Sequence, residues 1–199
     1  MVGKNAAILA LLYQSATFDT VDHSILLDRL SARFGVSGLA LNWVRSYLEN
    51  RSQSVCVFGI SSPPISLRYG VPQGSVLGPI MFTLYNSPLH DIATLHDIND
   101  HYYVDDTQYV KSFKLTEDGQ HQRLAYASLS NCIGGSILWM TENRLKGNDE
   151  KTDALVVHSG AGKCKPLDLP LFAGTVAITP SQSVKNLGVI LDPQLTMND

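Results

Sequence analysis

The chain has 199 residues, 44% hydrophobic and 17% charged, with a formal net charge of −3. This length suits one full-sized core, or a core with a small appendage. The composition excludes collagen-like repeats and long disordered segments. Affinity for nucleic acid comes largely from Lys and Arg. The acidic balance and the scattered basic residues therefore argue against nucleic-acid binding by this chain alone.

The cysteines and the hydropathy of the chain indicate where in the cell the protein is located. Cys56, Cys132 and Cys164 lie far apart, without the spacing of metal ligands. This pattern is typical of reduced thiols and predicts an intracellular protein, in the cytoplasm or nucleus. No apolar run approaches 18 residues, so we expect no membrane-spanning helix. Residues 6–12 could be the core of a short signal peptide or a buried strand, and the strand is favoured because the motif that follows requires one.

Helical spacing of apolar residues predicts four helices along the chain. The first covers residues 24–34, with Asp22 as its N-cap and Gly35 as its end. The others cover residues 39–48, 80–89 and 117–145. Gly134 and Gly135 should weaken the last helix, because glycine disfavours a helix interior.

Strand patterns fill the intervals between these helices. They predict strands over residues 54–58 and 65–68 with a turn at 59–64, and a hairpin over 101–113 with its tip at Val104 and Asp105. A strand over residues 152–158 precedes a loop at 159–167, and residues 175–178 form a final strand pair with 184–191. The order predicts an α+β fold with antiparallel pairing at its centre.

Two adjacent carboxylates, Asp105 and Asp106, are the residues most indicative of chemistry. Like charges side by side repel, and a bound divalent cation relieves that repulsion. Two such ions can promote in-line phosphoryl transfer. An ordinary turn is the simpler interpretation of the pair taken alone, because Asp is common in turns.

Further motifs decide between these interpretations. Residues 102–107, YYVDDT, resemble motif C of reverse transcriptases, and residues 70–79, GVPQGSVLGP, resemble motif B of the non-LTR (LINE-type) retrotransposon members. Residues 139–152 are similar to motif D, 175–192 to the strands that close the palm, and 11–23 to motif A. The resemblance covers the chain from about residue 6 to its end and implies a partial reverse transcriptase domain. We therefore expect a palm with a central antiparallel sheet packed on helices, with fingers and thumb largely missing.

The resemblance also implies site residues and partners. Asp105 and Asp106 would hold Mg²⁺ or Mn²⁺ and Lys151 would protonate the departing pyrophosphate, which makes these three the catalytic set. Phe18, Gln73 and Gly74 would contact the nucleotide, with Phe18 at the position that excludes a ribose 2′-hydroxyl. The implied partners are an RNA template, a DNA primer and a dNTP, with no membrane. The oligomeric state stays open.

Motif A departs from the family at its metal ligand. The family reads L-D-L-S-A-A-F-D, and this chain has Tyr13 where the first aspartate belongs. A phenol with a pKa near 10 is a poor Mg²⁺ ligand. Asp19 lies six residues further on, too far to take its place. We therefore expect weak or absent metal binding and weakened template binding. Three hypotheses follow: a polymerase that needs domains in trans, an inactive palm, which is favoured, or a domesticated nucleic-acid-binding or scaffold protein.

Overall fold

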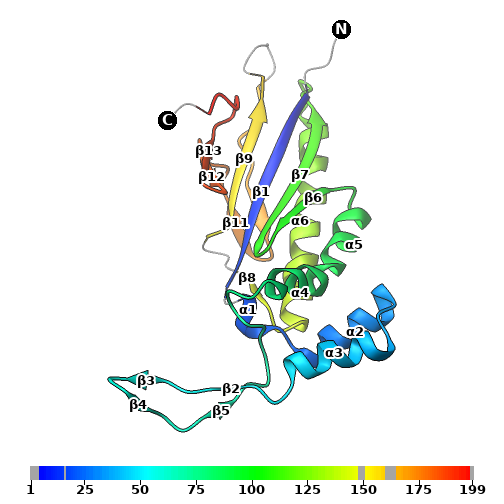
Figure 1. The fold of residues 1–199 in the computed structure, drawn as a ribbon. Coiled ribbons are helices and arrows are strands. Elements are labelled where there is room, and N and C mark those ends of the chain that lie inside the picture. The colour runs from blue at the N-terminus through cyan, green and yellow to red at the C-terminus, as the bar shows by residue number, and fades with distance from the viewer. Residues whose placement is uncertain (1–4, 16, 148–150, 160–164, 198–199) are drawn as a thin grey trace. The chain divides into compact units, whose positions relative to one another are not determined.

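The computed structural model describes residues 5–15, 17–147, 151–159 and 165–197. The chain divides into two compact units. Unit 1 comprises residues 1–15, 88–142 and 146–199, and unit 2 comprises residues 16–87 and 143–145. Each unit is built around its own secondary structure (Figure 1). None of the helices in the described ranges is long and apolar enough to cross a membrane.

Unit 1 is an antiparallel sheet with a long helix on one face (Figure 1). The strand order is β6-β7-β1-β9, from β6 (Asn99–Tyr103), β7 (Asp106–Lys114), β1 (Asn5–Ser15) and β9 (Asp153–His158); β8 (Lys146–Gly147) pairs with the end of β1. Helix α6 (Gln120–Glu142) and helix α5 (Pro88–Leu95) pack beside each other. The α+β prediction with central antiparallel pairing is confirmed.

Strand β1 is buried on both of its faces. Successive side chains of a strand point to opposite faces. Ile8, Ala10 and Leu12 accordingly join the core under α6, while Leu9 and Leu11 join a second cluster with Leu155 and Val184. This double burial explains the unbroken apolar run at residues 6–12 and confirms the strand prediction over the signal-like alternative.

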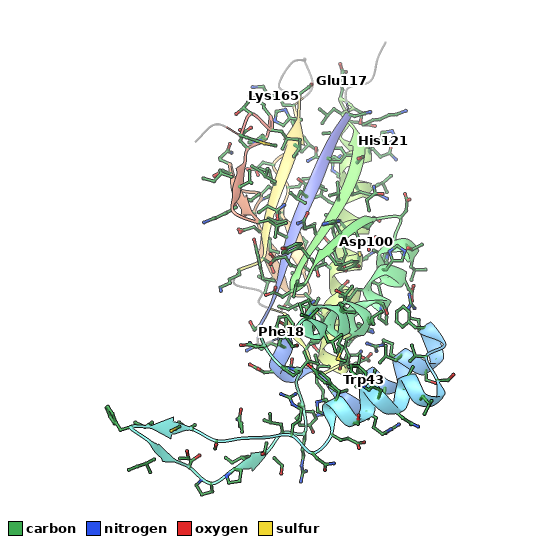
Figure 2. All side chains as sticks on the ribbon, in the orientation of Figure 1. Phe18, Trp43, Asp100, Glu117, His121 and Lys165 are labelled. Carbon is green, nitrogen blue, oxygen red and sulfur yellow. The ribbon has the colours of Figure 1, made fainter. Side chains whose placement is uncertain are left out.

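Unit 2 contains the helices α1 (Thr17–Thr20), α2 (His23–Phe34), α3 (Gly38–Leu48) and α4 (Leu77–Asn86). The carboxylate of Asp22 accepts hydrogen bonds from the Ser24 and Ile25 amides, and Gly35 ends α2 in the left-handed conformation with φ 68°. Both end signals are therefore as predicted. Trp43 stands on the exposed side of α3, where its ring stacks on Tyr47 at 5.8 Å (Figure 2).

Three element predictions were wrong in detail. The helix expected over residues 80–89 is two helices, α4 and α5, because Pro88 has no N–H to continue the α4 ladder and takes the first position of α5. The turn expected at 59–64 is the tight pair Phe58-Gly59, both with positive φ. The long helix ends at Glu142 rather than at residue 145.

The expected terminal strand pair was also wrong. Residues 176–178 (β11) pair with β10 (Leu171–Ala173), which was not predicted. Residues 184–191 are a hairpin of their own, formed by β12 (Val184–Asn186) and β13 (Val189–Leu191). Leu187 and Gly188 have positive φ and turn the chain between them. Gly188 is the sequence signal for this two-residue turn. The prediction of one strand over residues 184–191 overlooked it.

Candidate active site

The two carboxylates lie at the tip of the β6–β7 hairpin. Val104 and Asp105 form the turn, and Asp106 begins β7 opposite Tyr103. Val104 has a φ of 57°, so the turn is made by a β-branched residue in a conformation that such residues seldom adopt. The predicted hairpin and its tip are confirmed. Burial raises the pKa of the Asp106 carboxyl, and the neighbouring charge of Asp105 raises it further.

Tyr13 lies directly opposite Asp106 on the adjacent strand. Cross-strand Cα atoms are about 4.5–5.5 Å apart, and one residue along the chain adds about 3.8 Å, so Tyr13 lies within about 10 Å of Asp105. Strand β1 therefore lies directly beside the carboxylate hairpin. Burial raises the pKa of the Tyr13 phenol, as do the charges of Asp106 and Asp153. The phenol is thus a neutral group at neutral pH.

Tyr13 also contacts the β12–β13 hairpin on its face of the sheet. Its hydroxyl donates a hydrogen bond of 3.1 Å to the backbone carbonyl of Lys185. A second link joins the same elements, because the Gln108 amide on β7 donates to Asn186 Oδ1 at 3.0 Å. Beneath them, Val184 is buried among the apolar side chains of β1 and β9. The hairpin is therefore fastened to the sheet beside the carboxylates.

A hollow of about 520 Å³ opens at this place. It is lined by two acidic, two basic and three other residues: Asp106, Asp153, Lys151, Lys185, Tyr13, Leu187 and Gly188. The structure thus brings together Asp106, Lys151 and Tyr13, the residue that stands at the position expected for the third ligand. A larger hollow of about 660 Å³ in unit 1 contains none of the predicted residues.

Asp153 was not predicted as a site residue. It pairs with Leu11 in the register of β1 with β9, so it lies two positions from Tyr13 along the same face. The sequence did contain a signal for Asp153. The side chains at alternate positions of its strand share one face, and the later ones, Leu155 and Val157, are apolar, whereas Asp153 is charged. This change indicates that the apolar cluster on that face ends at Asp153.

The donor set does not fit a two-metal centre. Mg²⁺ prefers oxygen ligands of high charge density in a near-octahedral arrangement. The hairpin tip offers two adjacent carboxylates, and the facing position holds a neutral phenol whose hydroxyl is engaged with Lys185. Within the described ranges, no three His, Cys, Asp or Glu side chains gather closely enough to hold a metal ion.

The predicted nucleotide-contacting residues belong to unit 2. Phe18 in α1 packs its ring against Phe82 at 5.6 Å, and its carbonyl accepts a hydrogen bond from the Val71 amide at 2.7 Å (Figure 2 labels Phe18). Gly70 permits this contact, since a Cβ there would lie 3.0 Å from the Phe18 carbonyl oxygen. Motifs A and B therefore pack on each other through backbone.

Gln73 and Gly74 follow on the exposed loop that precedes α4. Gln73 lines a hollow of about 490 Å³ with Asp19, Arg51 and Tyr69. Gly74 has a φ of 75° and open space around its Cα. The basic residue Arg51 was not among the predicted residues, although a guanidinium in this hollow is the natural partner of an anionic ligand.

Motif D is divided between the two units. Trp139 and Met140 lie on α6 in unit 1, whereas Asn143 and Leu145 belong to unit 2. In unit 2 the Tyr85 hydroxyl donates to the Asn143 carbonyl at 2.7 Å. Lys151 is exposed, and Asn148 lies outside the described residues.

Sequence comparisons match the chain to one protein family and to two polymerases of mobile elements. The sequence model of the family described as reverse transcriptase (RNA-dependent DNA polymerase) matches residues 3–191. The chain is 30% identical over 203 residues to the RNA-directed DNA polymerase from mobile element jockey of Drosophila melanogaster, covering 100% of this chain and 21% of that protein. It is 28% identical over 186 residues to the probable RNA-directed DNA polymerase from transposon BS of the same organism, covering 90% and 19%. The chain thus spans about a fifth of these relatives.

Solved structures show the same fold. Telomerase from Candida tropicalis, in complex with a fragment of telomeric RNA, matches with a TM-score of 0.65 at 12% identity, over 98% of this chain and 30% of that one. Telomerase from Candida albicans, in complex with a similar fragment, matches with a TM-score of 0.62 at 15% identity, over 96% and 30%. The likeness at this identity concerns the fold alone.

Proposed function

Because the chain belongs to the reverse transcriptase (RNA-dependent DNA polymerase) family, among its non-LTR retrotransposon members, we propose that it is a palm portion that does not synthesise DNA as written. The parent activity is RNA-directed DNA synthesis from a dNTP on an RNA template and a DNA primer. The proposal includes an intracellular location, in the cytoplasm or nucleus, where such templates occur.

One observation carries the proposal: Tyr13 stands opposite Asp106 where the family places a carboxylate. The substitution removes one negative charge and introduces a ring into the same space. Metal ions contribute several kcal/mol to phosphoryl transfer, and each 1.36 kcal/mol is about tenfold in rate. Loss of the centre would therefore lower the rate by about three decades or more.

Lys151 and the nucleotide-contacting residues retain the chemistry of their predicted roles. Lys151 carries a proton donor beside Asp106 in the same hollow. Gln73 offers an amide and Arg51 a guanidinium at an exposed hollow suited to a polar, anionic ligand. These features support residual binding of nucleotide by the chain, with template and primer held weakly because basic residues are few.

A second candidate is a domesticated scaffold or nucleic-acid-binding protein with a palm fold. Two features favour it: the sheet is well formed, with strand β1 buried on both faces, and the position opposite Asp106 holds an uncharged residue. Selection for binding to a partner alone would preserve the sheet but not the charge of the catalytic position.

A primer-extension assay tests the proposal. Four proteins are compared: the chain as given, Tyr13→Asp, and each of these joined to the flanking regions of the jockey polymerase. We expect template-dependent synthesis only in the joined Tyr13→Asp protein. The matched control is Tyr103→Asp in the joined protein that retains Tyr13. This substitution places a carboxylate on the other side of Asp106, and the protein should stay inactive.

The outcomes separate the alternatives. Synthesis by the unmodified chain would refute the proposal, and synthesis by the joined Tyr13 protein would show that another residue replaces the ligand. An inactive chain that binds an RNA–DNA duplex at 150 mM salt with a dissociation constant of about 10⁻⁸ M would support the nucleic-acid-binding candidate, since non-specific binding at such salt gives dissociation constants of only about 10⁻⁴–10⁻⁶ M.

A further inference from the structure

The β2–β5 hairpin of unit 2 exposes its apolar residues to solvent. Its two arms pair in two short ladders, β2 (Ser52–Gln53) with β5 (Ile65–Ser66) and β3 (Cys56–Val57) with β4 (Ile60–Ser61). Five large apolar side chains along it are more than half exposed: Val55 67%, Val57 55%, Phe58 101%, Ile60 78% and Ile65 66%. Side chains stand out along both arms in Figure 2. An isolated two-stranded hairpin is marginally stable in water, so such a surface indicates a partner.

The two arms differ in how their free edges are protected. Proteins protect exposed strand edges with charges and prolines. Residues 52–67 contain no charged residue, and Pro63 and Pro64 lie on the returning arm. The outgoing arm, residues 52–58, has neither a charge nor a proline. Its edge is therefore the less protected of the two against pairing with another strand.

The hydrogen-bond pattern shows which backbone groups this edge offers. Val55 faces the returning arm, because its carbonyl accepts the Ser62 amide at 2.8 Å and its amide donates to Ser62 Oγ at 3.0 Å. In an antiparallel pair, successive residues direct their N–H and C=O groups to alternate sides. The N–H and C=O of Cys56 therefore point toward the open edge.

We propose that this edge is a self-association surface, at which the outgoing arms of two copies pair antiparallel around a two-fold axis through Cys56. A two-fold interface uses the same patch on both copies, which an antiparallel strand pair centred on one residue provides. In this register Cys56 meets Cys56 of the second copy and Val55 meets Val57. β-Branched residues placed opposite each other are favourable cross-strand pairs. The proposal goes beyond the proposed function and does not depend on polymerase activity.

The exposed surface is sufficient for a weak dimer. Val55, Val57 and Ile60 lie on one face of the hairpin, and Phe58 lies at its tip. Together they offer on the order of 500 Å² of apolar area per copy, or roughly 1,000 Å² in a dimer. Pairing of the two arm edges buries only part of this area, so the interface is smaller than that of stable complexes and belongs with the transient ones. We therefore expect reversible dimers at protein concentrations of about 10–300 μM.

Sedimentation equilibrium under reducing conditions is the first test. Val55 and Ile65 are matched in exposure and lie on opposite arms, so each is replaced by Lys. Val55→Lys adds a charge to the open edge and should weaken dimerisation at least tenfold. Ile65→Lys should change it less than threefold. Circular dichroism melts of both variants check that unit 2 remains folded.

Disulfide trapping is the second test. With Cys164 replaced by Ser, the chain retains exposed Cys56 and buried Cys132. Oxidised glutathione would accept the two electrons as two Cys56 thiols form one disulfide, since paired Cα atoms about 5.5 Å apart are within disulfide range. We expect a Cys56–Cys56 peptide by mass spectrometry. A monomer at 300 μM without this peptide, or equal effects of the two Lys substitutions, would overturn the proposal.

Discussion

Tyr13 and Lys185 are joined by a hydrogen bond from the phenol hydroxyl to the backbone carbonyl, at 3.1 Å. Tyr13 therefore has two effects at one position. It places a neutral phenol opposite Asp106, and it attaches the β12–β13 hairpin to the sheet. Substitution of Tyr13 by Asp would add a negative charge at this position and remove the attachment.

The attachment can be measured by hydrogen exchange of the backbone amides of β12 and β13. Tyr13→Phe removes only the hydroxyl, and an exposed hydrogen bond of this kind contributes about 0.5–1.5 kcal/mol. Protection of residues 184–191 should therefore fall about 2–10-fold, while the Gln108–Asn186 link and buried Val184 keep the hairpin folded.

Tyr103→Phe is the matched control for this measurement. Tyr103 also pairs with Asp106, but from β6, and it is 58% exposed. Loss of its hydroxyl should leave the protection of residues 184–191 unchanged. Equal losses in both variants would show that Tyr13 does not hold the hairpin through Lys185.

Short-range signals predicted the elements better than the pairings between them. Asp22 and Gly35 mark the ends of α2 because each acts on residues within one turn. The division at Pro88 and the turn at Leu187-Gly188 were overlooked although their signals are local. Strand β10 was missed because it is a short strand that forms by pairing with β11, and its own three residues carry no clear strand pattern.

For the site, the sequence alone singled out the carboxylate pair, while the place of Tyr13 came from the resemblance to motif A. The register of β1 with β7 then put Tyr13 opposite Asp106. Asp153 was missed, because the nearness of β9 to Tyr13 depends on a pairing between residues about 140 positions apart. The break in apolar alternation at Asp153 is a local signal, but the local pattern does not show which strand lies beside β9.

The two glycines inside α6 should respond differently to substitution by alanine. A Cβ at Gly134 would have open space, so Gly134→Ala should stabilise the chain by about 0.5–1 kcal/mol. A Cβ at Gly135 would lie 3.3 Å from Ile92 Cγ2 on α5, so Gly135→Ala should gain less or destabilise. Urea unfolding at fixed pH measures both, and a gain at Gly135 as large as that at Gly134 would contradict the close packing of α5 on α6.

Asp22 should make stability depend on pH. Burial alone would raise the pKa of its carboxyl, but hydrogen bonds from the Ser24 hydroxyl and from the Ile25 and Ser24 amides, with the nearby Arg144 charge, lower it below the ordinary value. A lowered carboxyl pKa contributes stability above the unfolded-state pKa, and that stability is lost as pH falls through the folded-state pKa.

Asp22→Ala should therefore cost about 1–2 kcal/mol at pH 7, the loss of a helix cap and an ion pair, and much less near pH 2. Chemical unfolding at several pH values measures the difference. Asp28→Ala, at an exposed position on the same helix, is the control and should show a small effect at every pH. A cost at Asp22 that stays constant from pH 7 to pH 2 would contradict the predicted role of its charge.

Divalent cation binding should depend on the residue at position 13. The chain has Asp105 and Asp106 at the hairpin tip and Asp153 in the same hollow as Asp106, but a phenol in the position directly opposite Asp106. Calorimetric titration with Mn²⁺ or Mg²⁺ should therefore give a dissociation constant in the millimolar range or no signal. Tyr13→Asp adds a carboxylate directly opposite Asp106. One more negative charge about 4 Å from a divalent cation contributes about 2 kcal/mol even at the dielectric constant of water, so affinity should rise about tenfold or more.

Leu187→Asp separates this effect from a general change in charge. Leu187 lines the same hollow and tolerates Asp, since its φ of 48° lies in the left-handed region where Asp is comparatively frequent. It should raise affinity by less than threefold, because its carboxylate is not placed opposite Asp106. Asp105→Asn in the Tyr13→Asp background should abolish the gain, because the new carboxylate and the hairpin tip must bind the ion together. Micromolar binding by the unmodified chain, lost in Asp105→Asn, would show that Tyr13 does not prevent a metal site.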